Sequence, residues 1–172
     1  MRRAELEHIL RAAGAISAER EIIVIGSQAI LGSYADPPPE LLVSLEADVY
    51  PAANPAKAAL IDGSIGELSP FHDTFGYFAH GVGPETARLA PGWEGRLVPL
   101  SNENTHGVTG LCLSVVDLAI SKLAAGRPKD LDYVKILLAH GLVRKDEILS
   151  LIGPLEEAER IRATLQRLDS RR

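Results

Sequence analysis

The chain has 172 residues, a net charge of −5, 46% hydrophobic residues and 5% aromatic residues. This length predicts one domain with an aliphatic core, and the acidic balance argues against broad, nonspecific nucleic-acid binding, which needs a basic surface. The single cysteine, Cys112, excludes an intrachain disulfide, is typical of a reducing compartment and is expected to be buried. The sequence shows no signal peptide and no apolar run near the roughly 18 residues of a membrane span, so we expect a cytoplasmic protein without membrane contact.

The first two-thirds of the chain is expected to mix short helices and strands. Apolar residues at helical spacing predict an opening helix over 3–13 that Gly14 ends, and the β-branched run 22–25 predicts a strand buried on both faces. Alternation from Leu41 predicts a second strand with an acidic face. The remaining expected elements are a helix over 54–61, strands over 71–82 and 96–100, a polar loop over 101–107, and a short strand or helix lead-in over 110–113.

The last third of the chain changes to helical patterning. A capping-box-like start at Ser114 predicts a helix that Gly126 ends, and Pro128 opens a second helix that Gly141 ends. Two more helices are expected over 144–152 and 154–169. The fold class is therefore α+β within a single domain, 1–172, with a small mixed sheet in residues 1–113 and a helical C-terminal part in residues 114–172.

Two acidic residues, Glu46 and Asp48, stand two positions apart on the second predicted strand. Residues at this spacing share a face and lie about 6.6 Å apart, so their carboxylates repel each other unless a cation lies between them. Hard oxygen ligands suit Mg²⁺, which binds one or two carboxylates together with substrate phosphates. The alternative is an ordinary strand with a solvated acidic face.

Gly26 and Ser27 follow the first predicted strand directly, with Ser27 expected to cap a short helix to Leu31. Backbone N–H groups at such a junction favour a phosphate group, glycine allows an oxygen to approach closely, and the serine hydroxyl can donate a hydrogen bond. The alternative is an ordinary helix cap. The glycine-serine turn and the paired acids together are more specific than either feature alone.

These segments resemble a known family signature. Gly26-Ser27 followed by Ser44-Leu45-Glu46-Ala47-Asp48 is similar to the motif of the DNA polymerase β-like nucleotidyltransferases. The segment from Asp117 to Asp132, which holds Lys122, Arg127 and Asp130, resembles a second motif of the minimal nucleotidyltransferases. That group includes the DUF6036 proteins and the AbiEii-type toxins of bacterial toxin–antitoxin systems.

The resemblance implies a nucleotidyltransferase-type sheet flanked by helices and a specific division of roles. It implies nucleotide binding by Gly26, Ser27 and Arg127, Mg²⁺ binding by Glu46 and Asp48, neutralisation of a nucleotide phosphate by Lys122, and orientation of Lys122 or the substrate by Asp130. For the second group, the alternative is a set of charges that covers a helix–helix junction.

The implied reaction is Mg²⁺-dependent transfer of a nucleoside monophosphate from an NTP to a hydroxyl, on the 3′ end of a tRNA or on a protein. A toxin role would add a cognate antitoxin as partner.

The sequence departs from the family motif in its first acid, Glu46, and in a longer spacer after Ser27. The expected third carboxylate has two candidates, Asp73 and Glu94. If neither reaches the metal, a nucleotide-binding or partner-binding module without efficient turnover is expected instead. A structural protein with no nucleotide binding is the third alternative.

Overall fold

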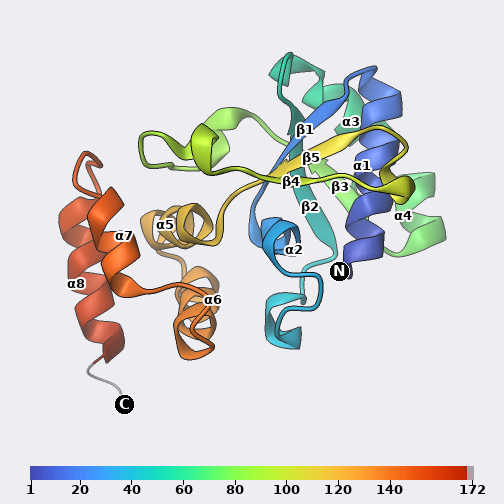
Figure 1. Ribbon diagram of the computed structural model, residues 1–172. Helices are drawn as coiled ribbons and strands as arrows, with labels where there is room; N and C mark the ends of the chain where they lie inside the picture. The colour runs from blue at the N-terminus through green and yellow to red at the C-terminus, as the bar shows by residue number, and fades with distance from the viewer. Residues whose placement is uncertain (170–172) are drawn as a thin grey trace. The chain divides into compact units, whose positions relative to one another are not determined.

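The computed structural model describes residues 1–169, which divide into two compact units (Figure 1). The sheet-containing unit is formed by Met1–Ala87 and Leu97–Ser114. The helical unit is formed by Arg88–Arg96 and by the chain from Val115 onward. The helical unit thus includes a loop from the middle of the chain in addition to the C-terminal helices.

One mixed sheet of five strands organises the first unit, in the order β3-β2-β1-β5-β4. The strand β1 is antiparallel to β2 and parallel to β5, while β2 and β3 are parallel and β4 and β5 are antiparallel. The strands are β1 Glu21–Ile25, β2 Glu46–Pro51, β3 Phe78–Gly81, β4 Val98–Leu100 and β5 Thr109–Cys112. A mixed α+β fold with a sheet flanked by helices is thus confirmed.

Four α-helices accompany the sheet in this unit: α1 Arg3–Ser17, α2 Ile30–Ser33, α3 Ala58–Ile65 and α4 Pro70–Phe75. Short 3₁₀ turns lie at Ser27–Ala29, Pro39–Leu41, Pro55–Lys57, Pro84–Thr86 and Glu103–Thr105. Figure 1 shows α1, α3 and α4 grouped against the strands, and α2 lying where β1 ends. The core is aliphatic, because four of the five residues of β1 are buried and α1 contributes Leu6, Ile9 and Leu10 to the same core.

The end of the opening helix differs from the sequence-based expectation. The opening helix passes through Gly14 and ends at Ser17, with Ala18 in the left-handed conformation at φ 55°. Gly14 is needed for packing and not for termination, since a Cβ there would overlap the side chain of Val108.

The expected strand over 71–82 is wrong in its first half. Residues Pro70–Phe75 form α4, which Ser69 caps by accepting a hydrogen bond from the backbone N–H of His72. Gly76, at φ 77°, ends this helix, and β3 follows. The aromatic residues that suggested a strand form a cluster in which the rings of Phe71 and Phe75 stack around His8.

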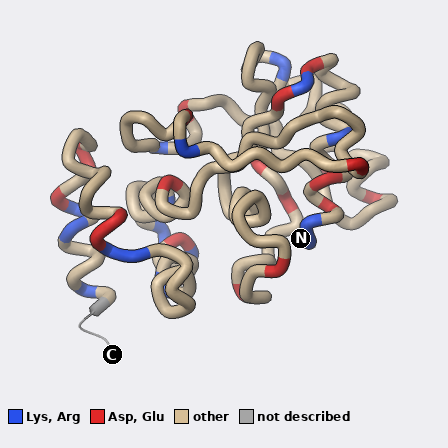
Figure 2. Tube along the Cα trace, in the orientation of Figure 1, with Lys and Arg blue, Asp and Glu red and all other residues tan. Residues whose placement is uncertain are grey.

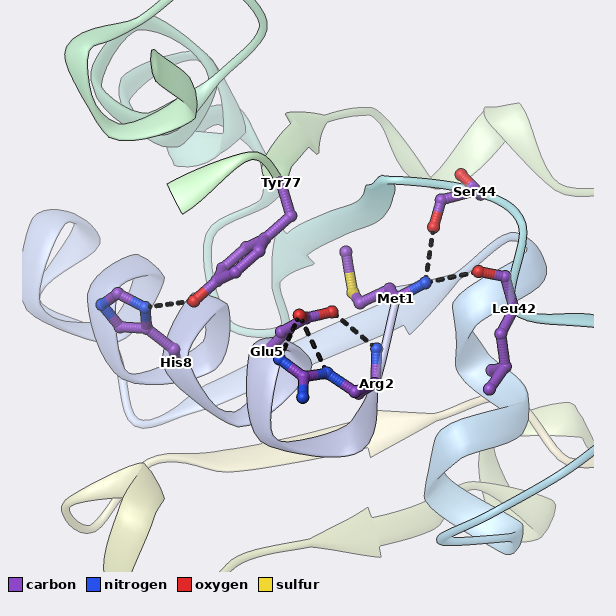
Figure 3. A network of polar contacts seen from close by, with 7 residues as sticks. All are labelled: Met1, Arg2, Glu5, His8, Leu42, Ser44 and Tyr77. Atoms are coloured by element: carbon purple, nitrogen blue, oxygen red, sulfur yellow. Dashed lines mark hydrogen bonds and ion pairs between the residues drawn. The ribbon is translucent and has the colours of Figure 1, made fainter. Parts of the chain in front are cut away.

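The second strand also starts later than expected, at Glu46 and not at Leu41. Its position is fixed from α1, because the amine of Met1 donates hydrogen bonds to the carbonyl oxygens of Leu42 and Ser44 (Figure 3). The Ser44 hydroxyl then accepts a hydrogen bond from the backbone N–H of Glu46. These contacts tie the start of α1 to the strand that carries the paired acids.

The helical unit contains α5 Val115–Ala125, α6 Pro128–Ala139, α7 Lys145–Leu151 and α8 Ala158–Asp169, together with the turn Trp93–Arg96. Asp117 is fully buried and receives two hydrogen bonds from the guanidinium of Arg96, at 2.7 and 2.8 Å. This ion pair joins the recruited loop to α5. Within residues 1–169, no helix combines the length and the apolar character that crossing a membrane requires.

Candidate functional site

The turn after β1 lies directly against the second acid of β2. In the antiparallel register Ile25 pairs with Asp48, so Gly26 lies beside the Asp48 carboxylate. Gly26 has φ 71° and ψ −172°, a backbone conformation that essentially only glycine adopts. A Cβ at Gly26 would overlap Oδ2 of Asp48. Glycine is therefore required twice here, once for the backbone and once for the approach of the carboxylate.

A histidine on the third strand completes the surroundings of Asp48. The parallel register places His80 of β3 opposite Asp48, and Nδ1 of His80 lies 2.9 Å from Oδ1 of the carboxylate. The His80 side chain is half exposed and the Asp48 side chain is 22% exposed. The carboxylate is thus held between the imidazole on one side and the Gly26 backbone on the other. Sequence reasoning missed His80, because the pairing depends on the register of β2 and β3.

Glu46 lies two residues before Asp48 on the same strand and is half-buried. Among the residues that the structure describes, its carboxylate has no hydrogen-bond or ion-pair partner. Its backbone is fixed by Ser44, while its longer side chain remains available for a ligand. Glu46 and Asp48 therefore provide one oriented and one adaptable carboxylate.

Ser27 begins a 3₁₀ turn, Ser27–Ala29, and not the expected capped helix through Leu31. The following α2 has four residues, which is too short for an appreciable helix dipole, so phosphate binding here would rely on the turn itself. The turn packs on β2. Its central residue, Gln28, is 1% exposed, and neither polar atom of its amide has a partner within residues 1–169.

Neither candidate for a third carboxylate lies on a strand. Asp73 is exposed on α4, and Glu94 is exposed in the turn Trp93–Arg96 of the helical unit. In the described part of the chain, no group of three or more His, Cys, Asp or Glu side chains is arranged to hold a metal ion. The position on β3 opposite Asp48 is held by His80.

The second predicted group forms a cluster within the helical unit. Nζ of Lys122 on α5 lies 3.2 Å from Oδ1 of Asp130 on α6, and Nε of Arg127 donates to Oδ2 of Asp130 at 2.6 Å. Lys122 is 9% exposed and its ammonium lies 4.7 Å from the ring centre of Tyr133. The Asp130 carboxylate therefore holds the Lys122 ammonium in an ion pair.

The charge state of Asp130 follows from this surrounding. Burial disfavours the ionised carboxyl, but the hydrogen bond from Arg127 and the charge of Lys122 outweigh it, so the pKa of Asp130 lies below its ordinary value. Burial also raises the pKa of the Tyr133 hydroxyl, which stays protonated. The cluster is thus one carboxylate, Asp130, paired with two cations, Lys122 and Arg127.

The mixed sheet, the glycine turn after its central strand and the two acids on the neighbouring strand define a fold of nucleotidyltransferase type. The family model described as "Nucleotidyltransferase of unknown function (DUF6036)" matches residues 4–152, and the chain belongs to this family. The match covers the sheet-containing unit and the helices α5 to α7. Comparisons with curated proteins and with solved structures found no match.

Proposed function

We propose that the protein transfers a nucleoside monophosphate from an NTP to an acceptor hydroxyl, using the Gly26–Asp48 site. The observation that carries the proposal is the close approach of the Asp48 carboxylate to the glycine turn, with Glu46 on the same strand. A phosphate bound at the turn would lie beside both acids. Phosphoryl transfer depends mainly on positioning and charge neutralisation, and a phosphate-binding turn beside two metal-binding carboxylates would provide both.

Mg²⁺ fits the donor set at this site. Two carboxylates plus substrate phosphates are the usual ligands of this ion, and a third protein ligand is not required. Glu46 and Asp48 would hold it, and the ion would neutralise the phosphate charge. His80 would keep Asp48 oriented, since a carboxylate with a hydrogen-bonded partner has fewer accessible rotamers.

Taken by itself, the cluster of the helical unit is proposed to neutralise a nucleotide phosphate through Lys122, with Arg127 as a second cation. In support, Asp130 fixes the Lys122 ammonium, and a fixed charge loses less entropy when it meets a phosphate. The acceptor would be the 3′ end of a tRNA or a protein hydroxyl. In a toxin–antitoxin setting, a small cognate antitoxin would be the partner.

The direct test incubates the protein with α-labelled NTPs, Mg²⁺ and tRNA, or with a protein mixture, and follows the transfer of label. We expect Asp48→Asn to abolish transfer while leaving the fold intact. Asp73→Asn is the matched control, because its exposed carboxylate on α4 should be dispensable. Transfer that survives Asp48→Asn, or transfer that requires Asp73, would refute the two-acid site.

A second candidate is a nucleotide-binding module that lacks turnover. The two-acid site favours it, since no three-carboxylate group forms within residues 1–169. Calorimetry with NTP and Mg²⁺, combined with a pyrophosphate assay, separates the two functions. Binding without pyrophosphate release, in the presence of every acceptor tried, would favour the module. Absence of Mg²⁺-dependent binding would favour a structural protein and exclude both.

A further inference from the structure

A hollow of about 400 Å³ lies in the sheet-containing unit, at the end of the sheet where α1 runs into β1. The second half of α1, the turn from Ala18 to Arg20 and the turn from His106 to Val108 line it. Figure 1 shows that β1, the central strand, runs from this junction with α1 to α2 at its other end. The Gly26–Asp48 site lies at that other end of β1.

The charges around the hollow are mainly positive. Arg11 and Arg20 line it together with His106, and the exposed Arg20 guanidinium has no hydrogen-bond or ion-pair partner among the residues that the structure describes. The one acid of the lining, Glu19, is already paired with the ammonium of Lys57 at 2.7 Å. Since the chain as a whole carries −5 and Figure 2 shows both signs of charge along it, this local excess of cations is a feature of the hollow.

The geometry of the hollow is preset by contacts outside it. Nη1 of Arg11 donates to the carbonyl oxygen of Asn104, which leaves the rest of its guanidinium fork available. Nζ of Lys57 also donates to the carbonyl oxygen of Ser17, so the Glu19–Lys57 pair is held at the end of α1. An anion entering the hollow would therefore meet the oriented guanidinium of Arg11 and would not have to displace a carboxylate from Arg11 or Arg20.

The rest of the lining is small and apolar, with Ala15, Ala18 and Val108 as its side chains. The volume lies within the range of small-molecule sites and far exceeds that of a lone phosphate ion. Guanidinium groups match the oxygens of phosphate well, and alanine and valine side chains suit an uncharged organic body. We propose that this hollow binds a small phosphate monoester, with Arg11 and Arg20 on the phosphate.

This site is separate from the proposed transferase site. The five residues of β1, Glu21–Ile25, lie between Arg20 and Gly26, and the six steps of extended chain span roughly 20 Å. The inference does not rest on the transferase activity, and either proposal can fail without the other. A phosphate ester bound here would contact neither Glu46 nor Asp48.

Calorimetry on the full chain without Mg²⁺ tests the proposal, with AMP and ribose 5-phosphate as probes and adenosine as the uncharged comparison. We expect both esters to bind and adenosine not to bind. Arg20→Gln should weaken binding about tenfold or more, because it removes a charge-assisted contact. Its fold should be intact, since the Arg20 side chain is exposed and makes no hydrogen bond or ion pair within residues 1–169.

Arg3→Gln is the matched control, because it removes the same charge from the other end of α1, and binding should be unchanged. Asp48→Ala should also leave binding unchanged. Absence of binding of either ester at millimolar concentration would overturn the proposal. So would binding that Asp48→Ala abolishes and Arg20→Gln spares, which would assign the ester to the transferase site. If an oligoribonucleotide binds and neither ester does, the proposal is also wrong, and the ligand of the hollow is an RNA backbone.

Discussion

Replacing Gly26 by alanine tests the geometry on which the proposed site depends. The substitution adds one methyl group to a backbone at φ 71° and ψ −172°, a conformation that costs other residues about 1–3 kcal/mol. The new Cβ would also lie 3.0 Å from Cγ and 3.2 Å from Cβ of Asp48, closer than ordinary van der Waals contact. We expect Gly26→Ala to destabilise the protein and to push the Asp48 carboxylate away from the turn.

The two costs can be separated. Backbone strain alone should lower the melting temperature by roughly 2–12 °C, given 2–4 °C per kcal/mol for a chain of this size. The steric cost comes on top of it and depends on Asp48. In an Asp48→Ala background the carboxylate is gone and only the Cβ at 3.2 Å remains, so Gly26→Ala should cost the backbone term plus a small residual contact. The double-mutant cycle therefore isolates the contact between the turn and the acid.

Urea unfolding of the four proteins in the cycle provides the free energies. Gly63→Ala in α3 is the matched control, because apart from its chain neighbours and its own helix backbone no atom of the described residues lies within 4 Å of a Cβ built there, and alanine is the better helix former. This control should be neutral or slightly stabilising. A Gly26→Ala protein as stable as the wild type would refute the backbone argument. An equal cost in both backgrounds would refute the contact with Asp48.

Three further predictions concern single side chains. His80→Phe should lower nucleotide transfer about tenfold or more, and His80→Asn, which keeps a donor near Asp48, should restore most of it, as initial rates will show. Asp130→Asn should cost about 3 kcal/mol at pH 7, because it leaves the buried Lys122 charge poorly compensated. Folding lowers the pKa of Asp130, so its contribution to the free energy of unfolding is complete at pH values above the ordinary carboxyl pKa. That contribution is lost as the pH falls through the pKa of the folded state. The urea midpoints of wild type and Asp130→Asn should therefore converge in acid. Burial raises the pKa of Cys112 to about 12, so a thiol reagent at pH 8 should label it only at the rate of unfolding; rapid labelling would refute its burial.

Several elements of the fold could be predicted from local patterns in the sequence. The buried run of β1 and the glycine or proline ends of α5 and α6 depend on residues within one turn or one strand, so they could be predicted. Gly14 and the 71–82 segment could not. The need for glycine at position 14 comes from its contact with Val108, which is distant in sequence. The start of α4 depends on the Ser69 cap, which precedes an aromatic stretch that also suits a strand.

The candidate site likewise contains residues that local spacing predicts and one residue that depends on how the strands pair. Glu46 and Asp48 share a strand face, and that follows from a spacing of two. His80 is found only when β3 is placed next to β2 in register, which depends on the whole sheet. The third carboxylate expected from the family motif stays a prediction, and the position opposite Asp48 holds the imidazole of His80.

An imidazole in that position changes what the site can be expected to do. A third carboxylate would add negative charge beside Glu46 and Asp48 and would need cations to balance it. The imidazole of His80 instead donates a hydrogen bond to Asp48 and brings no negative charge, so the charge of one Mg²⁺ would match that of the two carboxylates, Glu46 and Asp48. The two-acid site is thus consistent in charge as well as in geometry. The His80→Asp protein, titrated with Mg²⁺ and NTP, should bind the ion more tightly if this argument holds, and an unchanged affinity would contradict it.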